Sequence, residues 1–114
     1  MMDCLFCKIV KGSLPCDFIY EDDRVLAFND ITPQAPVHVL IIPKQHINSL
    51  ITISDDDIDI LVHIHRAVQV LVKQLKVDQL GFRLVVNTGT DGGQTVPHLH
   101  FHLLAGRNMQ WPPG

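Results

Sequence analysis

The chain has 114 residues, of which 46% are hydrophobic and 18% charged, and its formal net charge is −3. These values are typical of one globular domain and exclude a disordered chain. The acidic balance gives no general attraction to nucleic-acid polymers or to anionic membranes, so a nucleotide would have to be bound in a shaped pocket. We therefore expect a single domain over residues 1–114, with no polymer and no membrane as partner.

The first residues do not resemble a signal peptide, because Asp3 precedes only a short apolar run. No stretch approaches the roughly 18 apolar residues that span a bilayer. We expect a cytoplasmic protein in which Cys4, Cys7 and Cys16 are reduced. In that compartment a Cys-x-x-Cys pair is more often a metal or redox element than a disulfide.

Two short apolar segments in the first third of the chain predict a β-hairpin. Phe18–Tyr20 and Val25–Phe28 flank a charged turn. The next segment, residues 36–46 (PVHVLIIPKQH), predicts a strand that stops at Pro43. Its nearly continuous hydrophobicity indicates burial on both faces, which makes the polar His38 notable.

One long helix is predicted over residues 54–77. Ser54 and Asp57 resemble a capping box at its start. Apolar residues recur at helical spacing and predict one buried stripe, made of Ile58, Leu61, Ile64, Val68, Leu71, Val72 and Leu75. His63 and His65 lie two positions apart and point away from each other, so we interpret both as structural or solvated.

The last third of the chain contains two more predicted strands. Residues 81–87 (GFRLVVN) form one, a glycine-rich loop follows, and a histidine-containing segment forms the other. The tail is too rich in proline for a helix or a central strand. The order of elements predicts an α+β fold, in which one antiparallel sheet carries one main helix on one face.

Residues 98–103 read His-Leu-His-Phe-His-Leu, so a strand would project all three imidazoles from one face. The alternating apolar residues would then pack under the helix. A solvent-exposed strand face or a row of metal-binding histidines could give the same alternation. A solvent-exposed face would, however, normally carry mixed Thr, Lys and Glu. Neutral imidazole is a good nucleophile because its ordinary pKa is about 6.5. Covalent catalysis by such a group divides one difficult displacement into two easier steps.

The loop that precedes the histidines has the composition of a phosphate cradle. Residues 90–95 read TDGGQT, and the glycines allow positive φ and close approach of an oxyanion to backbone N–H groups. A Gly-Gly pair alone is more often just a turn. Directly before three imidazoles it indicates a phosphate site beside a nucleophile.

The segment HLHFHLL resembles the His-φ-His-φ-His-φ-φ signature of the histidine-triad superfamily of nucleotide hydrolases and transferases. Residues 20–47, residues 91–107 and the closing WPPG are similar to its Hint branch, the histidine-triad nucleotide-binding proteins. The resemblance extends from Phe6 to Gly114. It implies a HIT-like fold, a homodimer joined through its sheets, and hydrolysis of purine nucleoside phosphoramidates such as adenosine 5′-phosphoramidate or AMP-lysine.

By position in the motif, the resemblance also implies catalytic roles. His100 would be the nucleophile that attacks the α-phosphorus and forms a nucleotidyl-histidine intermediate. His38 would support His100, by a hydrogen bond to its other ring nitrogen or otherwise. His102 would contact the phosphate and help to protonate the leaving amine.

The same resemblance implies a nucleotide-binding set. Asp30 would receive the ribose hydroxyls, a pairing that is favourable because it is charge-assisted. The phosphate cradle would be Asn87, Gly93, Gln94 and Thr95. The purine pocket would be lined by Phe6, Ile9, Phe28, Ile31 and Leu40, and each of these five could equally be plain core. Trp111 matches a residue near the active site across the dimer, or it could simply anchor the tail. Asn29 stands where many relatives carry histidine.

A structural zinc site is implied by the resemblance to bacterial-type relatives. Its ligands would be Cys4, Cys7, His46 and His98, and two thiolates with two imidazoles suit tetrahedral zinc. The alternative is a pair of small buried thiols in the first turn of a helix. If zinc binds there, His98 is structural and catalysis is left to the other two triad histidines.

Other functions fit the same motif. A Fhit-like dinucleoside polyphosphate hydrolase shares the triad, although the tail segment GR-x-M-x-WPPG argues against it. A nucleotide-binding scaffold that regulates other proteins would keep the pocket without needing turnover. A nucleotide transferase fits least well, because so short a chain leaves little room for a second large substrate.

Overall fold

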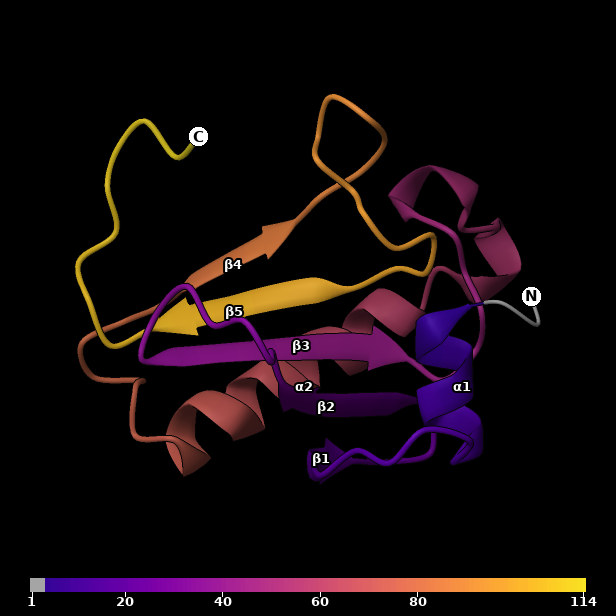
Figure 1. Ribbon diagram of the computed structural model, residues 1–114, viewed down its shortest axis with the longest axis horizontal. Helices are drawn as coiled ribbons and strands as arrows, with labels where there is room; N and C mark the ends of the chain where they lie inside the picture. Colours follow the sequence, from indigo (N-terminus) through magenta and orange to yellow (C-terminus); the bar gives the residue numbers. More distant parts are fainter. Residues whose placement is uncertain (1–3) are drawn as a thin grey trace.

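A computed structural model of the chain describes residues 4–114. Its centre is one five-stranded sheet in the order β1-β2-β3-β5-β4, in which all neighbouring strands are antiparallel (Figure 1). The strands are β1 (Phe18–Glu21), β2 (Val25–Asn29), β3 (Val37–Pro43), β4 (Arg83–Val86) and β5 (Phe101–Ala105). The predicted α+β class and the predicted hairpin are therefore confirmed.

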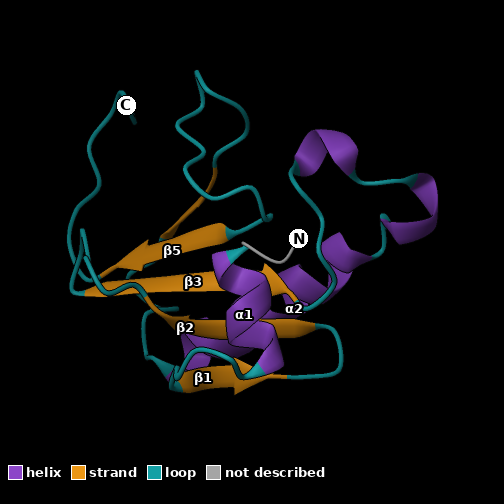
Figure 2. Ribbon diagram, turned by 45° about the vertical axis from the view of Figure 1, so that its right-hand side comes forward, coloured by secondary structure: helices purple, strands orange, loops and turns teal. Residues whose placement is uncertain are grey.

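Helices cover both faces of the sheet. The long helix α2 (Ile60–Gln74) lies behind the sheet, and the short helix α1 (Leu5–Lys11) lies in front of its other face (Figures 1 and 2). Two separate apolar clusters result, one between α2 and the sheet and one between α1 and the sheet. This double covering explains why the strand around His38 is so continuously apolar. Within residues 4–114, no helix is long and apolar enough to cross a membrane.

The long helix begins later than predicted. Residues 54–59 form tight turns that include a short 3-10 helix, η2 (Asp55–Asp57), and a second such turn, η1 (Leu50–Thr52), precedes it. Ser54 does not cap a helix, because its hydroxyl donates to the Asp57 carboxylate at 3.2 Å instead of accepting a backbone N–H. Ile58, expected in the buried stripe, is 51% exposed as a consequence.

The last strand also begins later than predicted. Of the three triad histidines only His102 lies in β5, whereas His98 and His100 precede it. The backbone explains the difference, since the N–H of Leu99 donates to the carbonyl of Ile47 at 2.7 Å and is thereby removed from any strand pairing. The predicted alternation of faces nevertheless holds, because Leu99, Phe101 and Leu103 are all buried in the cluster under α2.

Candidate active site and metal-binding cluster

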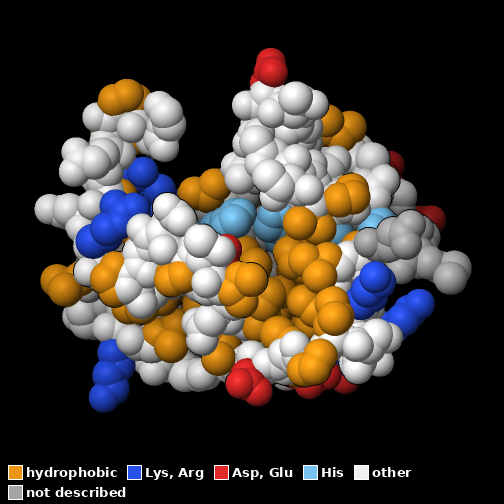
Figure 3. All heavy atoms as spheres, viewed as in Figure 1, with side chains coloured by type: hydrophobic (Ala, Val, Ile, Leu, Met, Phe, Trp, Pro, Cys, Tyr) orange, Lys and Arg blue, Asp and Glu red, His pale blue; other side chains and the backbone are white. Residues whose placement is uncertain are grey.

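A pocket of about 360 Å³ opens beside the triad histidines, on the face of the sheet that carries α1. Its floor and walls are mainly apolar, and in Figure 3 histidine side chains border an extended hydrophobic surface. The predicted residues that line it are Phe6, Ile9, Phe28, Asp30, Ile31, Leu40, Thr95, His100 and His102. The pocket thus combines an apolar cleft with a carboxylate and two imidazoles at its polar end.

Several residues that the sequence did not assign also line this pocket. They are Leu5, Leu14, Pro15, Cys16, Asn29 and Val96. Residues 14–16 belong to the connection between α1 and β1, which carries no periodic pattern that could have placed them. Asn29 ends β2 beside Asp30, so its neighbourhood to a predicted ribose ligand was the available signal.

Part of the predicted phosphate cradle builds the loop instead of lining the pocket. The Gln94 amide donates to the carbonyls of Asn48 and Val96, at 2.7 and 3.0 Å, and its oxygen accepts the N–H of Gly89. Gly93 has φ +80° and its N–H donates to the carbonyl of Thr90. Both residues therefore shape the loop, and Thr95 is the one member of the predicted cradle that reaches the pocket wall.

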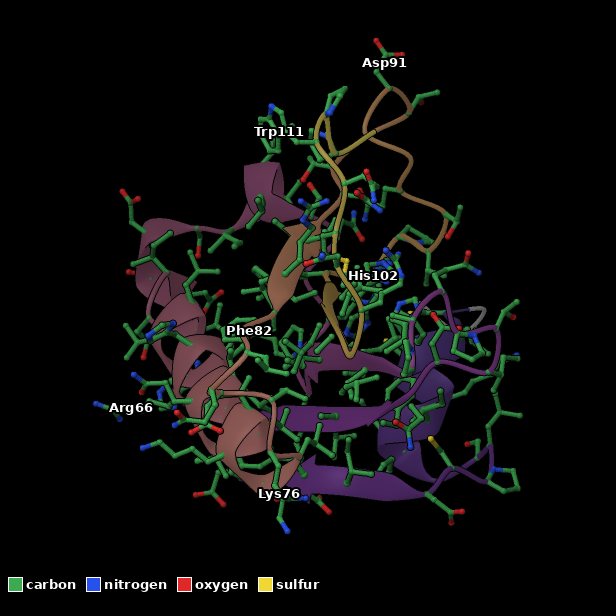
Figure 4. The ribbon with its side chains drawn as sticks, turned by 90° about the vertical axis from the view of Figure 1, so that its left-hand side faces the viewer. Arg66, Lys76, Phe82, Asp91, His102 and Trp111 are labelled. Atoms are coloured by element: carbon green, nitrogen blue, oxygen red, sulfur yellow. The ribbon has the colours of Figure 1, made fainter. Side chains whose placement is uncertain are left out.

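Two further residues of the predicted nucleotide site, Asn87 and Trp111, do not line the pocket in this single chain. Asn87 follows the end of β4 and is partly buried. Trp111 is 81% exposed and lies at the far end of the C-terminal segment from His102 (Figure 4). A role for Trp111 at the site would therefore require a second chain.

A single hydrogen bond determines which ring nitrogen of His100 carries a proton in the neutral ring. Its Nδ1 lies 2.7 Å from the carbonyl oxygen of His98, and a carbonyl can only accept, so Nδ1 carries the proton. In the neutral ring Nε2 then carries a lone pair. Phe6 packs edge-on against the ring with 5.2 Å between centroids and holds its orientation.

His38 and His102 form a second hydrogen-bonded unit. The backbone N–H of Gln34 donates to His38 Nδ1 at 3.0 Å, so the ring proton of His38 lies on Nε2. That proton is donated to His102 Nδ1, 2.9 Å away, which places the proton of His102 on its own Nε2. His38 therefore contacts His102 and not His100 as expected, because the other ring nitrogen of His100 is already bonded to the His98 carbonyl.

These bonds give the two pocket histidines opposite polarity. His100 presents a lone pair, whereas His102 presents an N–H donor, and their ring centroids are 5.1 Å apart. Burial lowers the pKa of His102, and repulsion from the neighbouring imidazoles of His100 and His38, when protonated, lowers it further, whereas the Asp30 carboxylate opposes the shift. The neutral ring is thus favoured, which is the form that the hydrogen-bond pattern requires.

The four predicted zinc ligands come together next to Phe6, whose ring packs edge-on against His98. Ligand atoms of Cys4, Cys7, His46 and His98 all lie within 4.8 Å of one another. Cys7 Sγ lies 3.1 Å from His46 Nδ1, and Cys4 Sγ lies 3.4 Å from His98 Nδ1. The chain therefore gathers two sulfur and two nitrogen donors from α1, from the segment after β3 and from the triad.

The donor chemistry of this cluster suits zinc. His98 Nε2–H donates to the carbonyl of Pro43 at 2.9 Å, and His46 Nε2–H donates to Asn48 Oδ1 at 2.7 Å, so both Nδ1 lone pairs face the thiols. Burial lowers the pKa of His98 and keeps its ring neutral. Burial also raises the pKa of the Cys7 thiol, so a metal would have to displace its proton.

A second group of possible ligands, Asp30, His38 and His102, is less suited to a metal. The His38 nitrogen that would bind such a metal is Nε2, and this atom carries the ring proton because the Gln34 N–H donates to Nδ1. A metal there would require either an imidazolate or two N–H groups facing each other. We therefore interpret these residues as a hydrogen-bond network, in which Asp30 Oδ2 lies 3.5 Å from His38 Nε2.

Comparison with known proteins places this geometry in a family. The family described as "Scavenger mRNA decapping enzyme C-term binding" matches residues 3–111. A solved histidine triad protein from Clostridium difficile is 53% identical with a TM-score of 0.93, and the match covers 96% of each chain. A HIT family hydrolase from Legionella pneumophila is 48% identical with a TM-score of 0.95, covering 98% of this chain and 100% of that one.

Two curated relatives match over nearly their whole length. A "14 kDa zinc-binding protein" of Brassica juncea is 46% identical over 114 residues, covering 98% of this chain and 100% of the relative. An uncharacterized HIT-like protein of Synechococcus elongatus is 48% identical over 112 residues, covering 98% and 97%. The likeness therefore includes the strands, both helices and the segments that carry the histidines.

Proposed function

The chain belongs to the histidine-triad family, and from its pocket we propose that it is a purine nucleoside phosphoramidase. The reaction would hydrolyse the P–N bond between a purine nucleoside 5′-phosphate and an amine. The observation that carries the proposal is the opposite polarity of His100 and His102 at the polar end of an apolar pocket. The Nε2 lone pair of His100 is the nucleophile, and the Nε2–H of His102 is a hydrogen-bond donor for the phosphoryl oxygens.

In the first step, Nε2 of His100 attacks the α-phosphorus and the P–N bond breaks. The resulting nucleotidyl-imidazolium keeps its Nδ1 proton, whose bond to the His98 carbonyl at 2.7 Å stabilises the positive ring. Water then attacks the phosphorus and the P–Nε2 bond breaks, which restores the neutral ring and releases the nucleotide. The amine takes up one proton as it leaves and the attacking water releases one, so the cycle balances.

We assign His102 to stabilisation of the phosphate. Neutral His102 has one ring proton, on Nε2, because its Nδ1 accepts from His38. Full transfer of that proton to the leaving amine would leave an imidazolate, whereas a hydrogen bond to a phosphoryl oxygen does not. We therefore assign to solvent the proton that the leaving amine takes up.

The apolar part of the pocket fits a purine. Phe6, Phe28 and Leu40 offer flat and branched apolar surfaces to the faces of a base, and exposed Ile31 lies at the pocket edge. Asp30 lines the same pocket, and its Oδ2 lies 3.5 Å from His38 Nε2, so we assign it to the hydroxyls of the ribose that connects base and phosphate. The family also supports a nucleotide as ligand in general, and the choice of a purine and of a P–N bond is our proposal.

The Cys/His cluster is proposed to hold zinc through Cys4, Cys7, His46 and His98. The name of the Brassica juncea relative supports this assignment. The role of the ion would be structural, since four protein ligands complete a tetrahedral shell and leave no position for a substrate.

A homodimer joined near β4 is the proposed assembly. β4 is an edge strand of the sheet, and the apolar side chains of Leu84 and Phe82 remain exposed there. On α2, Val62 is also exposed. A two-fold partner would cover this apolar surface and pair with the free edge.

The test compares turnover of a fluorogenic adenosine 5′-phosphoramidate by the wild type and by His100→Ala. We expect turnover by the wild type and a loss of roughly 10³-fold or more in the variant, with AMP binding retained in calorimetry. Diadenosine polyphosphate is run in parallel, and a preference for it would indicate the Fhit-like activity instead. AMP binding without turnover of either compound would support a regulatory nucleotide-binding scaffold.

A further inference from the structure

His98 belongs to the metal-binding cluster and to the catalytic site at once. Its ring is fully buried and its Nδ1 faces the thiols of Cys4 and Cys7, at 3.4 and 3.6 Å. The backbone carbonyl of the same residue accepts the Nδ1–H of His100 at 2.7 Å. Any rotation of the His98 backbone would therefore disturb the bond that determines which nitrogen of His100 carries the proton.

A second connection runs through Phe6, which lies between the two cysteines in the sequence. Cys4 caps α1, since its sulfur accepts the N–H of Cys7 at 3.4 Å. The Phe6 ring packs edge-on against both His98 and His100, with centroid separations of 5.8 and 5.2 Å. The first turn of α1 thus carries two ligands of the cluster and the ring that holds the nucleophile in place.

From these two connections we propose that metal binding by the cluster positions the nucleophile. Cys4, Cys7 and His46 act as positioning residues through His98 and Phe6. None of these three residues lines the substrate pocket. The proposal concerns the geometry of His100, and only its kinetic consequence rests on the proposed phosphoramidase activity.

Loss of the metal would leave two thiols and two imidazoles without a common partner. The His98 ring is then held by its bond to the Pro43 carbonyl and by contacts with two unligated thiols, so the start of α1 is freer to shift with Phe6. A His100 ring that loses the carbonyl can move its proton to Nε2, which removes the attacking lone pair. Phe6 also lines the purine pocket and packs against Phe28 with 5.8 Å between ring centroids, so some loss of nucleotide affinity is expected as well. Asp30 is not a ligand of the cluster and is held by the N–H of Thr32, so affinity should fall less than the rate.

The experiment follows the Nδ1–H proton of His100 by NMR in the wild type. This proton should exchange slowly, because it is buried and bonded, and its signal is assigned by its absence in His100→Ala. Removal of metal with a chelator under reducing conditions should abolish the signal, and one equivalent of zinc should restore it. Circular dichroism monitors whether the chain stays folded throughout.

Kinetics on variants provide the second measurement. His46→Ala removes a ligand that does not line the substrate pocket. His63→Ala is the matched control, because His63 lies on α2 beside Tyr20 and Arg66, apart from the pocket and from Leu84. We expect His46→Ala to lose bound zinc and to form the nucleotidyl-histidine about 10- to 100-fold more slowly, with the dissociation constant for AMP changed by less than about three-fold. His63→Ala should match the wild type in zinc content, rate and affinity.

Three results would overturn the proposal: a wild type that takes up no zinc, a His100 signal that survives metal removal, or equal losses of rate and AMP affinity in His46→Ala. A wild type without phosphoramidate turnover would instead refute the proposed function. The NMR measurement would still decide the positioning role in that case, because it needs no substrate.

Discussion

His38 and His102 are diagonal neighbours on adjacent strands, and Nε2 of the first lies 2.9 Å from Nδ1 of the second. In the β3–β5 register His38 pairs with Leu104 and Leu40 pairs with His102, which puts both rings on the α1 face of the sheet. The Gln34 N–H fixes the direction of the proton in this pair. A backbone amide thereby determines which nitrogen of His102 carries the proton.

Replacing His38 by alanine should lower the rate without abolishing binding. The His102 ring would lose its only fixed donor, and its Nδ1 and Nε2 would compete for the proton. We expect kcat for a phosphoramidate to fall about 10- to 100-fold while the affinity for AMP changes little. Steady-state kinetics and calorimetry measure the two effects, with His63→Ala as control, and an unchanged kcat would contradict the role of this pair.

Asp30→Asn should weaken recognition of the ribose. In the free protein Asp30 Oδ1 accepts the N–H of Thr32 at 2.8 Å, a bond that asparagine can keep, so the loop should stay folded. The loss of a charge-assisted bond to a hydroxyl is expected to raise KM about 10-fold. Substrates with ribose and with 2′-deoxyribose should differ in kcat/KM for the wild type and much less for the variant; equal discrimination in both proteins would remove Asp30 from this role.

The fold was predictable from local patterns, whereas the ends of elements were not. Period-two and helical spacing are properties of neighbouring residues, so they correctly placed the hairpin, β3, β4 and the body of α2. The start of α2 depends on whether the Ser54 hydroxyl bonds to a backbone N–H or to the Asp57 carboxylate, and sequence patterns do not decide between two such local partners. The start of β5 depends on the Ile47 carbonyl, which is distant in the sequence.

The candidate site shows the same division. The triad motif pointed to His100 and His102, which line the pocket, and most residues expected around a nucleotide line the same pocket. Motif position could not reveal that the Gln94 amide is used within its own loop, because this depends on Asn48 and Val96 carbonyls. It also could not distinguish His100 from His102 as the partner of His38, which is a matter of strand register.

The proposed dimer predicts that Leu84→Glu produces a monomer. Leu84 is 37% exposed on the edge strand β4, and a buried carboxylate in a dimer interface would be strongly destabilising. Analytical ultracentrifugation should show a dimer for the wild type and a monomer for the variant. Ile51→Glu introduces the same charge at an exposed apolar residue of η1 and should remain dimeric, whereas a monomeric wild type would refute the assembly.

Trp111 allows a direct test of a contribution across the dimer. It is the single tryptophan of the chain, and it does not line the pocket of its own chain. If the partner's tail reaches the site, AMP should change the fluorescence of Trp111 in the wild type and not in monomeric Leu84→Glu. An identical response in both proteins would show that the tail senses nucleotide within one chain.

Tyr20 gives a prediction about pH that is independent of the catalytic site. Its hydroxyl donates to Asp22 Oδ2 at 2.7 Å, and this bond, with burial and the negative charge, raises its pKa to about 12. Since the unfolded side chain titrates near 10, the stabilisation is complete below about pH 10 and is lost as the pH rises toward 12. Because the chain has one tyrosine, tyrosinate absorbance reports this group alone.

Asp22→Asn should move that titration toward the ordinary value, because asparagine removes the charge that opposes ionisation of the phenol. The matched control is Asp23→Asn, since Asp23 is an exposed neighbour that makes no bond to Tyr20 and should leave the titration unchanged. Asp22 also accepts the N–H groups of Arg24 and Val25, both at 2.8 Å, so the amide oxygen must keep the turn intact. Equal titration curves for the wild type and Asp22→Asn, in chains that remain folded, would show that the carboxylate does not control the phenol.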